Sequence, residues 1–586
     1  MSSDESDVEF EGFSETDVNN AEQEVLAAEE RLRIILNEQG IGDDSEGDYN
    51  ESDNEDEGEQ EVNVDERGDG AGGDGWHNGF NIFERGLPHI FTPRGNTGPS
   101  RVMGAEKEVL DFWQLYMDDP FLEYIINKTD NYANYNIQQR PNDNKMPWSI
   151  PTLPEIKAFL GLTYQMGISR KPSTKLYWST DPIMVTPIFS STMTRDRYTQ
   201  LLQYLHFSDH ANEPRQGEQN FDPLYKIKPV VNQLNNKFGL EYVPKRNVTI
   251  DECMVPFKGR SLLKQYIPSK PHKWGVKVWM LAESDNSYIQ YIDVYPGRTV
   301  RTEGSLGSSV VKNCIEGANI AGQGYHVYTD NFFTSPNLYL ELWENYETAA
   351  CGTVRTSRAG LPKDIMCKKP VNISVRGDLQ FRQKGALLAV SWKDKKNVSV
   401  LSTIHNESIG QVTRAVNVDG QFARQEFNCP SAIVDYTSNM GGVDKADQYI
   451  QYYCYHQKTL KWPKKVFFSL LEMVKFNAYR LFTLSPNHSS NLTFLQFSCL
   501  LVKGLINGYC AGVRRGRPLF APEQRLVQRH MPTTLNNKGR CHVCYMRQKN
   551  GKQENIRQTK YGCSLCGKHL CMPQCFTTYH TEKNYC

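Results

Sequence analysis

The hydrophobic positions change their spacing several times along the chain of 586 residues. Between residues 104 and 245 they recur every three or four positions, which is typical of helices that bury one face. A capping box at Thr152–Glu155 predicts the start of one helix, and Thr194 predicts the start of another. A later helical stretch, 462–508, has Pro463 in its first turn. We expect these two helical stretches to pack together.

From residue 246 the apolar runs become shorter and richer in β-branched and aromatic residues, which is typical of strands. The predicted elements are strand 247–256, a hairpin of strands 276–282 and 288–295, helix 308–320, strand 325–329, helix 336–346 and strand 349–354. A hairpin followed by alternating helices and strands predicts an α/β domain. Residues 357–430 contain short strands and polar loops, which we interpret as a β-rich insertion, and helix resumes near Gly442.

The N-terminal region differs from the rest of the chain in charge. Residues 1–74 contain 27 acidic and three basic residues, a net charge of −24, so residues 75–586 carry +22 within the overall −2. Residues 1–100 contain too few apolar side chains to offset the entropy of folding, and we predict a disordered tail with at most a short helix at 25–35. This tail either solubilises the protein or covers the basic body as a DNA mimic. A body with this positive charge attracts polyanions, which makes nucleic acid the first partner to test.

The sequence predicts no membrane segment. The most apolar stretch, Val466–Phe482, is interrupted by Glu472, Lys475 and Arg480. The acidic N-terminus lacks the basic segment and apolar run of a signal peptide. We therefore expect an intracellular protein in a reducing compartment, where thiols stay unpaired.

Seven of the 15 cysteines lie in the last 46 residues, which predicts a metal-binding module. Two CxxC pairs and three further soft ligands lie within 40 residues, a spacing typical of zinc sites. The predicted ligands are Cys541, Cys544, Cys563, Cys566, Cys571, Cys575 and His580. Two zinc ions need one more ligand, for which His569, His542 and Cys586 are the candidates. We favour an interleaved ligand order over two sequential sites, and both stay open.

Two β-rich runs of the predicted strands end in an acidic residue. Asp251 and Asp330 each follow a run of β-branched and aromatic residues, and Asp444 and Asp447 share one face if their segment is helical. Strand ends and a facing helix can bring carboxylates onto two Mg²⁺ ions about 3.5–4 Å apart. Hard divalent cations prefer such oxygen ligands. For any one of these residues, loop solvation or helix capping is an alternative explanation.

Several sequence blocks occur in a characteristic order. The blocks are Val248–Glu252 with Val255–Arg260, Tyr328–Ser335, Gly352–Arg355, Val434–Tyr436 and Met440–Asp444. In sequence and order they resemble the motifs of piggyBac-family transposases, over roughly residues 105–586. The resemblance implies an RNase H-like catalytic domain in which Asp251, Asp330 and Asp444 form the DDD triad and Asp447 is an accessory acid.

The resemblance also implies cofactors, partners and a location in the cell. It implies two Mg²⁺ or Mn²⁺ ions per active site and cut-and-paste transposition of double-stranded DNA, with insertion at TTAA and excision through hairpin ends. It further implies a nuclear homodimer that acts on transposon terminal repeats, which the zinc domain recognises. A purely structural or protein-binding zinc module is the alternative. The expected regions are the tail 1–100, the helical dimerisation and DNA-binding domain 101–246 and 456–530, the catalytic domain 247–356 and 431–455, the insertion 357–430 and the zinc domain 538–586.

Several further residues are candidates for DNA contact. By the same resemblance, Arg355 and Arg358 match residues that touch target DNA, and exposed arginines after a strand suit phosphate contact. Trp462 matches a Trp near the active site, and a core Trp at a helix start is the alternative. Arg515 and Arg517 resemble an AT-hook, whose arginines enter a narrow minor groove. A nuclear-import patch or a solvated linker is the alternative for that segment.

Two other classes of function compete with a transposase. One is a domesticated, non-cleaving DNA-binding or chromatin protein with the same fold. The other is a zinc-dependent ubiquitin ligase or histone reader, which leaves the central acids unexplained. The intact set of four acids favours the transposase, because carboxylates without metal repel phosphate.

Overall fold

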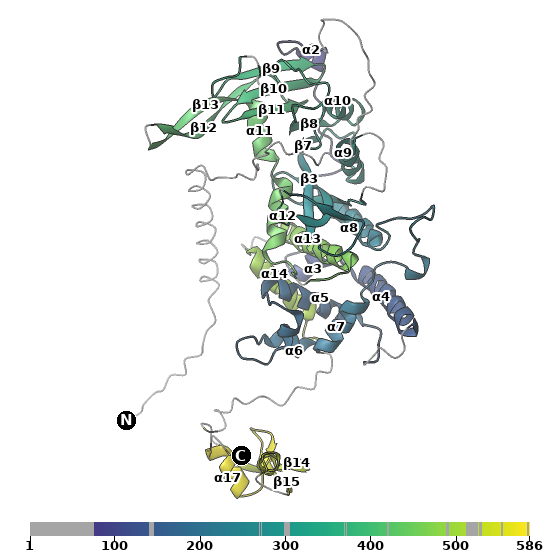
Figure 1. The fold of residues 1–586 in the computed structure, drawn as a ribbon, viewed down its shortest axis with the longest axis vertical. Helices are drawn as coiled ribbons and strands as arrows, with labels where there is room; N and C mark the ends of the chain where they lie inside the picture. Colours follow the sequence, from purple (N-terminus) through teal and green to yellow (C-terminus); the bar gives the residue numbers. More distant parts are fainter. Residues whose placement is uncertain are drawn as a thin grey trace. The chain divides into compact units, whose positions relative to one another are not determined.

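A mixed nine-stranded sheet lies at the centre of the larger part of the chain in the computed structural model (Figure 1). In order along the sheet its strands are β4 Lys264–Tyr266, β5 Trp274–Glu283, β3 Asn247–Pro256, β7 His326–Thr329, β8 Ala349–Thr353, β11 Asn397–Ser402, β10 Leu387–Lys393 and β9 Leu379–Lys384, and β6 Ile289–Val294 also pairs with β5. Strand β5 is antiparallel to both β3 and β6, whereas β3, β7 and β8 run parallel to one another. The predicted strand and hairpin positions are thereby confirmed to within a few residues.

The structure describes residues 75–586 except for 140–145, 269, 271, 298–304, 368–369, 371, 419–420, 457, 488–491, 511–525, 527–529, 552–554, 583–584 and 586. The acidic tail 1–74, with its predicted helix at 25–35, lies outside the described residues. The chain divides into two units, one formed by Met1–Tyr177 with Tyr198–Tyr509 and the other by Trp178–Arg197 with Cys510–Cys586.

Each face of the sheet is covered by two helices. Val248 and Val327 pack on α9 Leu306–Gly317 and α10 Pro336–Asn345 in one hydrophobic cluster. On the other face, Tyr328 packs with side chains of α11 Ser431–Asn439, and α12 Gly442–Tyr452 lies against β3. Neighbouring residues of a strand point to opposite faces. Alternate positions of β3 and β7 therefore build the core and face α11 and α12.

The β-rich insertion does not stand apart from the central sheet. Strand β11 pairs with β8, and β10 and β9 continue the same sheet. The prediction of short strands was also wrong for the end of this region. A hairpin of two ten-residue strands, β12 Ile409–Val418 and β13 Gln421–Pro430, follows there and leads directly into α11.

The early and late helical stretches pack together, as predicted. The helices are α3 Val109–Gln114, α4 Asp119–Gln139, α5 Leu153–Ile168, α6 Pro187–Thr192, α7 Arg195–Tyr204, α8 Lys228–Glu241, α13 Trp462–Leu484 and α14 Phe494–Ile506, with 3-10 turns at Thr174–Trp178 and His210–Asn212. Thr152 caps α5 by accepting a hydrogen bond from the backbone N–H of Glu155. Thr194 accepts one from Arg197 at the start of α7. The Tyr164 hydroxyl of α5 donates to the Leu471 carbonyl of α13 at 2.8 Å, which joins the two stretches.

The predicted disorder of residues 1–100 is wrong for residues 75–100. The indole N–H of Trp76 donates to the Gly360 carbonyl at 2.9 Å, and His77 exchanges two backbone hydrogen bonds with Gln383 of β9. A short helix, α2 Ile82–Arg85, follows, and β1 Gly98–Pro99 pairs with β2 Tyr242–Val243. These contacts with distant parts of the chain compensate for the low apolar content, which composition alone does not reveal.

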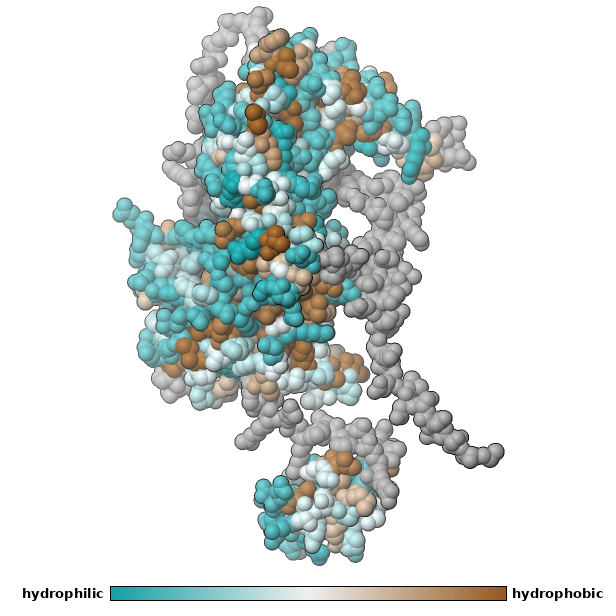
Figure 2. Space-filling model, turned by 180° about the vertical axis from the view of Figure 1, so that it is seen from behind, coloured by the Kyte–Doolittle hydropathy of each residue, from teal (hydrophilic) through white to brown (hydrophobic). Residues whose placement is uncertain are grey.

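The C-terminal unit contains a small three-stranded sheet. Its elements are β14 Pro532–Arg540, α16 His542–Lys549, β15 Gln558–Cys563, β16 Lys568–His569 and α17 Gln574–Thr581. Among the described residues, no helix has the length and apolar character needed to cross a membrane. On the face drawn in Figure 2, hydrophobic side chains are scattered among hydrophilic ones.

Candidate active site and candidate metal centres

Asp251 and Asp330 lie side by side on adjacent parallel strands. Ile250 of β3 is in register with Thr329 of β7. The residues that directly follow them are the candidate acids Asp251 and Asp330. The backbone N–H of Glu252 donates to Asp251 Oδ1 at 2.7 Å, and that of Phe332 donates to Asp330 Oδ1 at 2.9 Å. These short local hydrogen bonds fix the direction of both carboxylates.

Helix α12 brings the other two acids to the same strand. Gly442 at its start approaches both β5 and β3 so closely that an added Cβ would lie 2.9 Å from the Glu283 carbonyl oxygen and 3.2 Å from Thr249 Oγ1. Asp447 Oδ1 accepts a hydrogen bond from the Cys253 thiol at 3.4 Å. Asp444 lies close enough for its charge to raise the pKa of Asp251. Segments nearly 200 residues apart therefore bring four acids to one edge of the sheet.

The electrostatics of this cluster indicate a cation site. Burial raises the pKa of Asp251 well above its usual range, and the neighbouring charges of Glu252, Asp330 and Asp444 add to the effect. Burial and Glu252 likewise raise the pKa of Asp330, against the Phe332 N–H and Arg355. Carboxylates this close together need positive charge to ionise together. Their oxygen donors suit Mg²⁺, although no three of these four acids have ligand atoms that all lie within 4.8 Å of one another.

Three charged residues near the acids were not predicted from the sequence. Glu252 Oε1 lies 3.7 Å from Lys270 Nζ, and its Oε2 lies 3.9 Å from Lys277 Nζ. Burial acts to lower the pKa of Lys270, but Glu252 and Asp251 raise it overall. Lys277 Nζ lies 4.3 Å from the ring centroid of Trp279. Glu252 could have been found from the sequence, because it directly follows Asp251. The two lysines reach the site only through the fold.

The two arginines after β8 differ in their surroundings. Arg355 is exposed, and its Nε donates to Asn331 Oδ1 at 3.0 Å, next to Asp330. Arg358 is half-buried and donates to the Phe332 carbonyl. Arg355 therefore borders the acid cluster, whereas Arg358 braces the loop that carries Asp330, a structural role that the sequence did not indicate.

Trp462 lies at the start of α13 and lines a cavity of about 170 Å³. Tyr132, His206 and Lys464 are among the other lining residues, and none of the four acids is. Burial lowers the pKa of His206 to about 3 and that of Lys464 to about 7. The structure thus does not join Trp462 to the acid cluster. Arg515 and Arg517, the AT-hook candidates, lie outside the described residues.

The cysteine module contains two groups of four metal-binding side chains. In each group the ligand atoms all lie within 4.8 Å of one another. One group is Cys541, Cys544, Cys571 and Cys575, and the other is His530, Cys563, Cys566 and His580. The two groups alternate along the chain, which is the interleaved order that we favoured. Both fit tetrahedral zinc, which prefers thiolate and imidazole ligands.

Two of the three candidates for the eighth ligand, His542 and His569, were wrong. His530, which precedes the cysteine cluster by 11 residues, occupies that position. The His542 ring instead pairs with the Tyr585 hydroxyl at 3.0 Å, His569 is in neither group, and Cys586 lies outside the described residues. His530 lies before the cysteine cluster in the sequence, but Pro532 of β14 pairs with Cys563 of β15, which brings the His530 ring to 3.3 Å from the Cys563 thiol.

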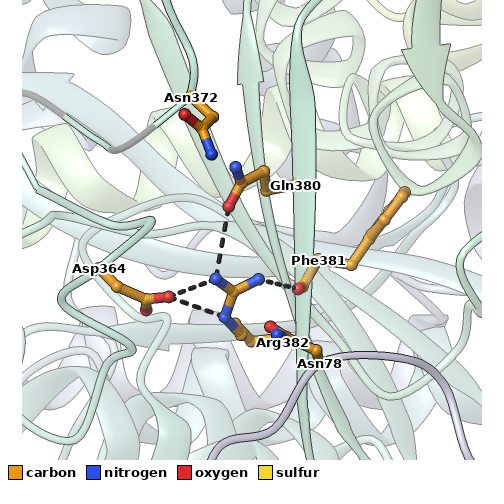
Figure 3. A pocket seen from close by; sticks show the side chains of 6 residues that line it. All are labelled: Asn78, Asp364, Asn372, Gln380, Phe381 and Arg382. Carbon is orange, nitrogen blue, oxygen red and sulfur yellow. Dashed lines mark hydrogen bonds and ion pairs between the residues drawn. The ribbon is translucent and has the colours of Figure 1, made fainter.

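A polar pocket of about 420 Å³ lies beside β9 (Figure 3). Its Arg382 guanidinium donates to Asp364, to the Phe381 carbonyl and to Gln380, as Figure 3 shows. The charge of Arg382 is thus matched within the chain. We assign no function to this pocket.

The comparisons with known proteins agree with this geometry. The family model described as Transposase IS4 matches residues 110–479, and the chain belongs to this transposase family. Within it, the chain is of the piggyBac type. It is 28% identical to the human "PiggyBac transposable element-derived protein 3" over 498 residues, 82% of this chain and 77% of that protein. It is 24% identical to the human "PiggyBac transposable element-derived protein 5" over 426 residues, 70% of this chain and 77% of that protein.

A solved structure has a similar fold. It is the cryo-EM structure of a piggyBac transposase synaptic complex with hairpin DNA, with a TM-score of 0.61 and 24% identity, covering 74% of this chain and 86% of that chain. The family resemblance noted in the sequence is thereby confirmed.

Proposed function

We propose that this protein is a cut-and-paste DNA transposase that uses Asp251, Asp330 and Asp444 as metal-binding catalytic acids and Asp447 as an accessory acid. The observation that carries the proposal is the meeting of these acids, from two parallel strands and one helix, at one edge of the sheet. The strand order β6-β5-β3-β7-β8, with three antiparallel strands followed by two parallel ones, supports an RNase H-like core.

The residues have distinct tasks in this proposal. Asp251, in the middle of β3, and Asp330, directly after β7, offer rigid carboxylates side by side, and α12 supplies Asp444. Two Mg²⁺ or Mn²⁺ ions, when bound, would stabilise the entering and leaving oxygens of an in-line displacement at phosphorus. Arg355, exposed beside Asp330, is placed to contact a phosphate of the DNA backbone.

The DNA partner and the assembly are part of the same proposal. The +22 charge of residues 75–586 supports the binding of double-stranded DNA. We propose that the substrates are transposon terminal repeats and TTAA target sites, that the zinc-loaded C-terminal module recognises the repeats, and that the active form is a nuclear homodimer. Basic side chains around the cysteines support this role for the module, namely Lys538, Arg540, Arg547, Lys549, Arg557 and Lys560.

Strand cleavage by the purified full chain tests the proposal. The substrate is labelled duplex DNA with the inverted repeats that flank the coding region, placed beside TTAA, with Mg²⁺ or with EDTA. We expect Mg²⁺-dependent cleavage at the repeat end, reduced more than about 100-fold by Asp251→Asn or Asp330→Asn, because even outer-shell partners of a metal are worth about 10- to 100-fold. Asp285→Asn is the matched control, since Asp285 pairs with Lys245 on an exposed hairpin turn. Equal cleavage by wild type and Asp251→Asn would refute the catalytic assignment.

A second candidate function is a domesticated DNA-binding protein without cleavage activity. The names of the human relatives favour it, because they describe proteins derived from transposable elements. High affinity for DNA without any Mg²⁺-dependent cleavage is the result expected of that function.

A further inference from the structure

Helix α11, just before the acid-bearing helix α12, forms hydrogen bonds with both strands that carry acids. From β3, Thr249 Oγ1 donates to the Asn439 carbonyl at 2.7 Å, and Asn247 Nδ2 donates to Asn439 Oδ1 at 2.9 Å. From β7, the Tyr328 hydroxyl donates to Asp435 Oδ2 at 2.6 Å. We call Asn247, Thr249, Tyr328, Asp435 and Asn439 the α11 latch.

Asp435 is the centre of the latch. Its Oδ1 accepts from Asn439 Nδ2 at 2.9 Å, one turn later on the same helix. Its Oδ2 is shared by Tyr328 and by His405 Nε2, which lies 3.1 Å away. Thr249 and Tyr328 are buried, with exposed fractions of 2% and 0%. A buried hydroxyl without a partner costs stability, so these hydrogen bonds hold α11 at one fixed position along β3 and β7.

The position of the latch relative to the acids follows from strand geometry. Thr249 precedes Asp251 by two residues, and Tyr328 precedes Asp330 by two residues. Residues two apart on a strand point to the same face, about 6.6 Å from each other. The latch and the acids thus lie on one face of the sheet. Thr249 comes two residues before Asp251, and Tyr328 comes two residues before Asp330.

The chain between the latch and the third acid leaves little slack. Only four residues, Met440 to Val443, separate Asn439 from Asp444. Gly442 lies among them, with an added Cβ only 3.2 Å from Thr249 Oγ1, so this segment contacts a latch residue as well. A shift of α11 along β3 and β7 would therefore move Asp444 relative to Asp251 and Asp330.

We propose that the α11 latch is a positioning device that sets the distance between Asp444 and the two strand acids, with Asp435 and Tyr328 as positioning residues. The inference rests on the proposed metal-dependent cleavage. It assigns a task to the Val434-Asp435-Tyr436 segment, whose Asp435 carboxylate points toward β7 and bonds no catalytic acid.

The test compares two buried tyrosines that differ in whether they touch α11. Tyr328→Phe removes one hydroxyl from the latch. Tyr325→Phe removes the hydroxyl that donates to the Pro244 carbonyl at 3.2 Å, from a side chain that is 1% exposed. Both variants of the full, zinc-loaded chain should show similar decreases in thermal midpoint. The probe is Mn²⁺, measured both by direct binding, from the electron paramagnetic resonance signal of free Mn²⁺, and by the Mn²⁺ concentration that half-saturates cleavage.

We expect Tyr328→Phe to raise the half-saturating Mn²⁺ concentration about tenfold and Tyr325→Phe to leave it unchanged. The expected effect is at the lower end of the range of about 10- to 100-fold for groups that bond a metal ligand directly, because Tyr328 acts on Asp444 only through α11. Asp435→Ala should have a larger effect, because it also removes the bonds to Asn439 and His405, and Tyr328→Phe added to Asp435→Ala should cause no further loss, because the acceptor of the Tyr328 hydroxyl is already gone. Equal Mn²⁺ dependence of Tyr328→Phe and Tyr325→Phe would overturn the latch alone. If the wild-type protein bound no Mn²⁺, or if its Mn²⁺ binding did not depend on Asp251, the proposed function would be overturned instead.

Discussion

Removal of zinc is expected to unfold residues 530–582 and to leave the α/β body folded. The hydrophobic core of this module consists largely of the ligands themselves, to which Val543, Leu570 and Tyr579 add the main apolar side chains. Such a core cannot offset the conformational entropy of about 50 residues. Structural zinc in small domains contributes about 10–16 kcal/mol of apparent binding free energy, which is also folding free energy.

The tryptophans make the two parts of the chain separately observable. All nine lie before residue 463, and eight of them, all except Trp178, belong to the larger unit, so tryptophan fluorescence reports mainly on the body. Chelation should leave that signal and its unfolding midpoint unchanged, release two zinc ions per chain, and open the module to protease. His530→Ala should weaken zinc retention, whereas His569→Ala, its matched control, should not, because only His530 belongs to a ligand group. If His569→Ala weakened zinc retention and His530→Ala did not, the eighth ligand would be misassigned.

The catalytic strands could be predicted from the sequence because their signals are local. The predicted strand 247–256 coincides with β3, and the acids Asp251 and Asp330 follow from the ends of short apolar runs. The capping residues Thr152 and Thr194 act within three positions of themselves, which a single sequence reveals.

Features that depend on contacts between distant residues could not be predicted. The pairing of β11 with β8 turned a supposed insertion into an extension of the main sheet. Trp76 is ordered by a carbonyl 284 residues away, so composition wrongly indicated disorder there. The same holds for Lys270, whose sequence surroundings are ordinary, and for the hydrogen bonds of Asp435 with Tyr328 and Asn439. Each gains its importance from the segment that the fold brings next to it.

Replacement of Lys475 alone is expected to destabilise the body by about 3–5 kcal/mol, because it leaves the carboxylate of Glu472 buried without its counter-charge. The two side chains, on α13, form an ion pair of 2.5 Å and are 0% and 3% exposed. Burial raises the pKa of Glu472, and Lys475 and the Tyr455 N–H oppose this increase. Lys475 Nζ also donates to the Tyr453 carbonyl at 3.0 Å, directly after α12. The pair therefore holds the C-terminal end of the acid-bearing helix as well as the core.

Urea unfolding followed by tryptophan fluorescence measures this effect on the body. Lys475→Met should lower the transition midpoint strongly, and Lys475→Met combined with Glu472→Leu should recover most of the loss, because no buried charge is then left unpaired. Lys245→Met is the matched control, since Lys245 and Asp285 form an exposed pair with side chains 58% and 56% accessible, and such pairs contribute about 0–1 kcal/mol. If Lys475→Met were as stable as Lys245→Met, the buried pair would not stabilise the fold. If the double variant were stable but cleaved DNA poorly, the contact with Tyr453 would be the part of the pair that serves the active site.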